Sequence, residues 1–94
     1  MKKELDDYLY ELTMNLKEGS EERFSAYKIA ESLQLNRSTI SSYLNQAFRE
    51  GELVKIKSYP VLFLHKKALE DASIETVKLE YDSLEELFAQ DQGT

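Results

Sequence analysis

The chain has 94 residues, of which 41% are apolar and 32% charged, and these values are typical of one small soluble domain with a single core. It has no cysteine and one histidine, His65, which excludes disulfides and thiolate metal sites and leaves no set of zinc ligands. The longest apolar run is the four residues from Val61 to Leu64, too short for a membrane span, and the amino terminus lacks the apolar stretch of a signal peptide. We therefore expect a cytoplasmic protein with no membrane partner.

The net charge of −6 hides a segregation of charge along the chain. Residues 1–22 hold three Lys against seven Asp or Glu, and residues 68–94 hold one Lys against eight. Residues 23–67, between them, hold eight Lys or Arg and three Glu, a net charge of +5. A basic block between acidic flanks favours a polyanion as the partner of that block. Segregation by chance is the alternative in so short a chain.

A first amphipathic helix is predicted over roughly residues 3–17. Its apolar residues recur at helical spacing, at Leu5, Tyr8, Leu9, Leu12 and Leu16. The opposite face is acidic, and Gly19 and Ser20 interrupt the pattern. We expect the apolar stripe to pack in the core, with a dimer contact as the alternative.

A helix-turn-helix is predicted over Ser25 to Gly51. Ser25 is expected to cap the second helix, whose apolar residues are Ile29, Ala30 and Leu33. The turn is predicted at residues 34–36, with Leu35 filling the core and Asn36 capping the third helix. Many helix-turn-helix units have glycine in this turn, where this chain has Gln34.

The third helix is predicted from about Arg37 to Glu50, with Gly51 ending it in a left-handed conformation. Its buried stripe is expected to consist of Ile40, Leu44, Ala47 and Phe48, with Tyr43 at the border. The other face holds small polar and basic side chains: Arg37, Ser38, Ser41, Ser42, Asn45 and Arg49. An ordinary solvent face would favour Glu and Lys, because serine and asparagine lower helix propensity. Short side chains allow close approach to a DNA groove, and Asn and Arg can make paired hydrogen bonds to base edges. A merely polar surface is the alternative.

A β-hairpin is predicted directly after this helix, with strands over residues 52–57 and 61–65 and a turn at Ser58-Tyr59-Pro60. A hairpin in this position is the wing of a winged helix. Lys55 and Lys57 share one face of the first strand and, with Tyr59 near the tip, are placed to contact phosphate or the minor groove. Solvated edge lysines are the alternative.

The remainder of the chain is expected to add little regular structure. His65 is predicted at the surface, and residues 66–72 are predicted to form one or two helical turns. Beyond them, Ser83 and Glu86 fit a capping box for a short helix. We expect this acidic segment, residues 73–94, to fold back on its own domain, to pair with a second copy, or to lead into a following domain.

The fold class that these elements predict is mainly α with a small β-hairpin. It is a winged helix-turn-helix over residues 1–72, with a three-helix core and a two-stranded wing, followed by the acidic segment. The residues that we predict to contact DNA are Ser25, Lys28, Arg37, Ser38, Thr39, Ser41, Ser42, Asn45, Arg49, Lys55, Lys57 and Tyr59.

About residues 24–70 resemble the amino-terminal winged-helix domain of LevR-type regulators, which are bacterial sigma-54-dependent activators controlled by the sugar phosphotransferase system. The resemblance is carried by the R-S-x-I-S-x-Y-L-N motif of residues 37–45 and the K-I-x-x-x-P-V motif of residues 55–61. It implies DNA binding upstream of promoters of sugar-uptake genes. It also implies that an AAA+ ATPase domain would follow residues 73–94, although the sequence holds no G-x-x-x-x-G-K-[ST] phosphate loop.

The leading hypothesis is sequence-specific binding of double-stranded DNA by a transcription regulator. A single winged helix offers a small interface, so we expect a homodimer or a higher assembly on DNA. The alternative is a winged helix that binds another protein, since a fold does not determine function. With no motif that organises catalysis, we expect no enzymatic activity, no cofactor or metal, and no small-molecule ligand.

Overall fold

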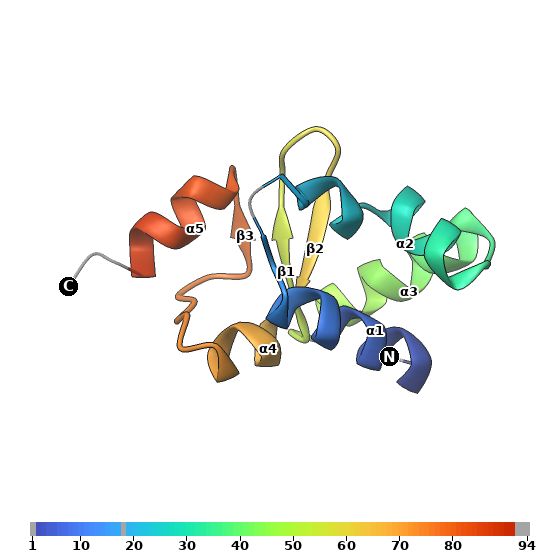
Figure 1. Cartoon of the computed structure of the whole chain (residues 1–94), viewed down its shortest axis with the longest axis horizontal. Helices are drawn as coiled ribbons and strands as arrows, with labels where there is room; N and C mark the ends of the chain where they lie inside the picture. Colours follow the sequence, from blue (N-terminus) through green and yellow to red (C-terminus); the bar gives the residue numbers. More distant parts are fainter. Residues whose placement is uncertain (1, 18, 92–94) are drawn as a thin grey trace.

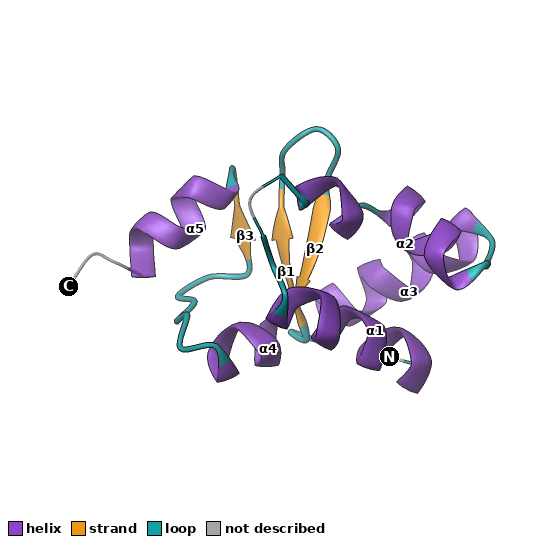
Figure 2. Cartoon of the chain, viewed as in Figure 1, coloured by secondary structure: helices purple, strands orange, loops and turns teal. Residues whose placement is uncertain are grey.

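The computed structural model describes residues 2–17 and 19–91, and it places a small β-sheet among the helices (Figures 1 and 2). In chain order the elements are α1 (Lys3–Met14), the 3₁₀ turn η1 (Glu21–Phe24), α2 (Ala26–Leu33), α3 (Arg37–Arg49), β1 (Leu53–Ile56), β2 (Leu62–His65), α4 (Lys66–Asp71), β3 (Glu80–Tyr81) and α5 (Leu84–Asp91). This mixed arrangement of helices and sheet is compatible with a winged helix. None of the helices in this part of the chain has the length and apolar character that crossing a bilayer requires.

One hydrophobic core takes side chains from the helices and from the sheet. The predicted helical stripes supply buried residues from α1, α2 and α3, namely Leu5, Leu9, Leu12, Ile29, Ala30, Ile40, Leu44 and Ala47. Helix α1 ends three residues earlier than predicted, and Asn15 follows it. The Asn15 side-chain amide donates to the carbonyl of Glu11 at 2.8 Å, a local bond that competes with continuation of the helix.

The predicted caps of the two central helices are confirmed. The Ser25 hydroxyl accepts a hydrogen bond from the Lys28 N–H at 3.3 Å. The Asn36 carbonyl oxygen accepts from the N–H groups of Ser38 and Thr39, at 2.7 and 3.4 Å. Each cap satisfies backbone donors that the first turn of a helix leaves without an intrahelical partner.

Gly51 turns the chain from α3 straight into β1. It has the predicted left-handed conformation, with φ of +80°. Its N–H donates to the Phe48 carbonyl at 3.0 Å, and the Glu52 N–H donates to the Ala47 carbonyl at 2.9 Å. These are the two bonds of a Schellman motif, and they leave only two residues between α3's cap and the strand. The hairpin is therefore held beside α3.

The sheet has three strands in the described residues, in the order β2-β1-β3. Strands β1 and β2 form the predicted antiparallel hairpin, with Ile56 opposite Leu62. A third strand was not predicted: β3 pairs in parallel with the other edge of β1. The N–H groups of Lys55 and Lys57 donate to the carbonyls of Leu79 and Tyr81, at 2.7 and 2.8 Å. Strand β1 is thus the central strand.

The acidic segment folds back on the domain in its described part, which is one of the three expected alternatives. Tyr81 and Leu87 are 1% and 0% exposed and belong to the same core as the helices. The Ser83 hydroxyl accepts from the Glu86 N–H at 3.1 Å, as the capping box predicts. The core therefore extends past residue 72, where we placed the end of the domain. Residues 92–94 lie outside the described residues.

His65 is buried, so its predicted surface position was wrong. Its side chain is close to α1, because its Nε2 lies 2.6 Å from Asp6 Oδ1. Its Nδ1 accepts from the Ala68 N–H at 3.2 Å and so caps α4, while its backbone N–H donates to the Thr13 hydroxyl at 3.0 Å. The sequence gives no sign of this burial, because Asp6 and Thr13 come from the other end of the chain. One residue thus joins β2 to α1 and α4.

Replacing His65 with Ala should lower the free energy of unfolding by roughly 2–3 kcal/mol, since it removes the cap of α4 and the partly buried hydrogen bond to Asp6. Urea denaturation monitored by circular dichroism measures this loss. The Asp6→Ala variant should show a smaller decrease in the free energy of unfolding than His65→Ala. The Asp7→Ala variant, changed at an exposed neighbouring position, should change it by less than about 0.5 kcal/mol. Equal stability of the His65→Ala and Asp7→Ala variants would contradict this role.

Candidate nucleic-acid interface

The turn between α2 and α3 sets the direction of α3. Gln34 adopts the left-handed conformation, with φ of 56° and ψ of 42°, at the position where glycine is common. The Leu35 N–H donates to the Ala30 carbonyl at 3.0 Å, which keeps the backbone of residue 35 against the end of α2. Leu35 is 46% exposed, so the prediction that it fills the core was wrong.

A groove of about 670 Å³ lies between α3 and the hairpin. Its lining includes six of the twelve residues predicted to contact DNA: Ser25, Arg37, Ser41, Asn45, Lys55 and Tyr59. These residues come from the start of α2, from α3, and from the hairpin. Residues that are far apart in the sequence and were all predicted to contact DNA therefore line the same concave surface.

The exposed face of α3 continues beyond the groove. Four further predicted residues are exposed on it: Ser38, Thr39, Ser42 and Arg49. Within the groove, the Asn45 amide donates to the Ser41 carbonyl at 2.8 Å, which uses one of its two N–H donors. The face thus offers short hydroxyl side chains with Arg37 at one end and Arg49 at the other.

Lys55 is the cation that the hairpin contributes to the groove. Its ammonium lies 5.3 Å from the ring centroid of Phe48 and 5.9 Å from that of Phe63. Both distances are within the range of cation–π attraction. The two rings, one from α3 and one from β2, therefore restrain the charge at the boundary between helix and hairpin.

Lys57 has a different environment from Lys55, although the sequence predicted a shared role. Its ammonium lies 4.0 Å from a carboxylate oxygen of Glu80 and 3.9 Å from one of Asp82. Both acids belong to the third strand and the residues next to it, a strand that the sequence pattern does not predict. Lys57 is therefore directed toward β3 and is not part of the groove lining.

The start of α2 contributes two predicted residues, Ser25 and Lys28. Ser25 is 2% exposed, and its hydroxyl donates to the Glu22 carbonyl at 2.8 Å while it caps the helix. The carboxylate of Glu31, 3.6 Å from the Lys28 ammonium, holds the pKa of Lys28 above its ordinary value, and Tyr27 adds to this effect. Ser25 thus has a structural role, while Lys28 remains charged beside the groove.

The groove is also lined by aromatic and apolar residues that were not among the predicted DNA contacts. They are Ala26, Tyr27, Pro60, Val61 and Phe63. Tyr27 and Val61 are 44% and 37% exposed, and Tyr59 at the turn is fully exposed. An aromatic residue two positions after the helix cap was the available sequence signal for Tyr27. The others become visible only when the hairpin is placed against α2.

No group of three or more His, Asp or Glu side chains able to hold a metal ion occurs among residues 2–17 and 19–91. The groove instead offers hydrogen-bond donors, two cations and aromatic surface.

The chain is similar to the transcriptional regulatory protein DagR of Salmonella typhimurium (strain 14028s / SGSC 2262), with 42% identity over 52 residues. The match covers 55% of this chain and 6% of that protein, so the chain spans only a small part of its relative. No protein-family model and no solved structure matches the chain.

Replacing Gln34 with Gly should raise the free energy of unfolding by about 0.5–1 kcal/mol, because glycine adopts the left-handed conformation without a Cβ penalty. The midpoint of urea denaturation measures the change. The matched control is Gln46→Gly, at an exposed position in the interior of α3. This change should lower the free energy of unfolding by about 1 kcal/mol. A Gln34→Gly variant as destabilised as this control would show that Gln34 is not under strain.

Proposed function

We propose that this chain binds double-stranded DNA sequence-specifically as a domain of a transcription regulator. The observation that carries the proposal is that six of the residues predicted to contact DNA, from three separate elements, line the groove between α3 and the hairpin. The similarity to DagR supports it, because that relative is named as a transcriptional regulatory protein. In this proposal the chain acts by binding and has no catalytic role.

Helix α3 enters the major groove in the proposed mode. Its small serine side chains let the helix backbone come close to the base edges, and Arg37, Asn45 and Arg49 read them by hydrogen bonds. Lys55 and Tyr59 of the hairpin contact the sugar-phosphate backbone and fix the register of the helix. The net positive charge of residues 23–67 favours a polyanion such as DNA over an uncharged partner.

The finer assignment is to a cytoplasmic LevR-type regulator with a winged helix-turn-helix. Its support is the resemblance of the motifs at residues 37–45 and 55–61. On this assignment the chain belongs to a sigma-54-dependent activator of sugar-uptake genes under phosphotransferase control. A second copy would bind a second half-site, because one such module alone gives a small interface.

Protein binding through the same surface is the second candidate function. The exposed side chains of Tyr27, Tyr59 and Val61 favour it, because all three line the groove and exposed apolar groups gathered in one place mark protein-binding surfaces. The two candidates differ in salt dependence. Only binding to DNA releases condensed counterions, so only DNA affinity should fall steeply with salt.

The affinity for a cognate duplex, selected from random sequences, should depend strongly on salt. About five phosphate contacts would give a slope of log K against log salt of roughly −4 to −5. Fluorescence anisotropy over a salt series measures this slope. The Arg37→Ala and Asn45→Ala changes should each weaken cognate binding by about 1–3 kcal/mol and leave the melting temperature nearly unchanged.

Gln46→Ala is the matched control for these two variants, because Gln46 is exposed on α3 but lies outside the groove. It should bind DNA like the unaltered chain. Cognate binding that is insensitive to salt, or equal for all three variants, would be evidence against the proposed mode.

The two hairpin lysines should differ in their effects on DNA binding. Lys55→Ala should make the salt slope shallower by roughly 1, as the loss of one phosphate contact predicts. Lys57→Ala should leave the slope nearly unchanged, because its ammonium pairs with Glu80 and Asp82. The same salt titration measures both. Equal loss of slope in the two variants would mean that Lys57 leaves these acids when DNA binds.

A further inference from the structure

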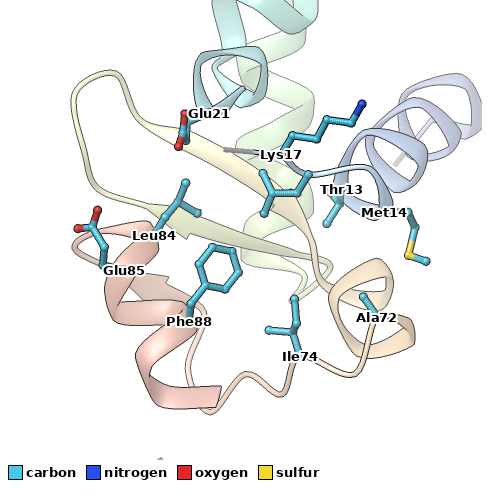
Figure 3. Close-up of a pocket in the computed structure, with 10 residues that line it drawn as sticks. Thr13, Met14, Lys17, Glu21, Ala72, Ile74, Leu84, Glu85 and Phe88 are labelled. Carbon is cyan, nitrogen blue, oxygen red and sulfur yellow. The ribbon is translucent and has the colours of Figure 1, made fainter. Parts of the chain in front are cut away.

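A second groove, of about 450 Å³, lies between the end of α1, the end of α4 and α5 (Figure 3). It shares no lining residue with the groove between α3 and the hairpin. Its walls come from segments far apart in the sequence, because both residues 13–21 and residues 72–88 contribute to its lining. Figure 1 shows α5 next to β3, on the side of the sheet away from α3. The proposed DNA contacts make no use of this surface.

The lining of this groove is largely apolar. Leu16, Ile74, Leu84 and Phe88 are partly buried and pack against the core, and Met14 is 41% exposed. Figure 3 shows Leu84 and Phe88 of α5 on one wall, with Thr13 and Met14 of α1 on the other. Apolar side chains that line a concave surface and are only partly covered gain by burial against a further apolar group.

The rim of the groove is acidic on one side. The carboxylates of Glu21 and Glu85 lie on the edge next to Leu84, and Lys17 extends away on the other edge (Figure 3). Glu86 also lies on α5, but Lys78 is bonded to it at 2.7 Å, and this contact is the main cause that lowers the pKa of Glu86. A cationic group that approaches the edge next to Leu84 therefore meets Glu21 and Glu85.

We propose that this groove binds a short amphipathic helix of another protein. Two apolar side chains at i and i+3 or i+4 would fill it, and a Lys or Arg of the same helix would lie against Glu21 and Glu85. Helix-in-groove recognition uses this spacing of anchors, and rim charges select the partner and its orientation.

The size and charge of the surface argue against a second copy of this chain as the occupant. The ten residues that line the groove are fewer than the roughly 20–30 that each side of a stable interface between globular proteins uses, so a second copy would need further surface around the groove. A symmetric contact through this groove would also bring together acidic flanks, since residues 1–22 and 68–94 carry net charges of −4 and −7. A short basic helix meets neither difficulty.

Selection from a display library of random peptides of about 14 residues, roughly four helical turns, tests the proposal on the full chain. The enriched peptides should share an apolar pair at helical spacing and a Lys or Arg beside it. Synthetic copies should bind the Met14→Glu and Glu85→Lys variants about tenfold more weakly or worse, as measured by fluorescence anisotropy. Changing the basic residue of the peptide to Glu should restore its binding to the Glu85→Lys variant.

Glu11→Lys is the matched control, because it makes the same charge change at an exposed position of α1 outside the groove. It should bind the selected peptides unchanged. All variants should keep the melting temperature and the DNA affinity of the unaltered chain, so loss of peptide binding would be distinct from loss of fold or of the proposed function.

Three results would overturn the proposal. The first is a library that enriches no such peptides, and the second is peptides that bind the Met14→Glu and Glu85→Lys variants as tightly as the unaltered chain. The third is self-association of the chain in sedimentation that Met14→Glu abolishes, which would assign the groove to a second copy.

Discussion

The left-handed turn at Gly51 fixes the hairpin against α3, and the groove between them depends on it. A side chain at this position would meet only Leu79, at an ordinary contact distance of 4.0 Å, so space does not explain the glycine. The constraint is conformational, because φ of +80° is adopted at low cost only without a Cβ. The two backbone bonds that follow it leave the hairpin little freedom to swing. Lys55 can then lie near a ring from α3 and a ring from β2 at the same time.

The predictable part of the fold was the part governed by local rules. Helical spacing predicted α1 to α3, and Ser25, Asn36 and Gly51 end or begin helices through their own short-range bonds. The errors concern contacts between segments that are far apart in the sequence. His65 is buried because of Asp6, 59 positions away, and β3 has two residues, too few to show an alternating pattern. Six of the eleven residues that line the groove were predicted, three of them on α3. Tyr27 and Phe63 were missed because they line the groove only when α2 and β2 are placed together.

Charge along the sequence identified the basic region, but contacts decide which cations face the groove. Four basic residues of the central block form ion pairs with acids in the described part of the chain: Lys28, Lys57, Lys66 and Lys67. The acids that pair with Lys57, Lys66 and Lys67 belong to the acidic carboxyl-terminal part of the sequence. Folding brings Lys57 of the basic block to acids of the carboxyl-terminal segment, while Lys66 and Lys67 pair with acids one turn further along α4. Arg37 and Lys55 are the cations that line the groove.

The position of β1 in the middle of the sheet also determines which strand edges are open. The hydrogen-bonding groups on the outer side of β2 are approached by two segments that are not strands. Ser25 forms a bridge to Leu62, and the Thr13 hydroxyl accepts from the His65 N–H. The opposite edge belongs to β3, which is only two residues long. Short or covered edges prevent strands of separate molecules from adding to one another. A hairpin that projects an exposed tyrosine can therefore be presented to a partner without becoming a template for aggregation.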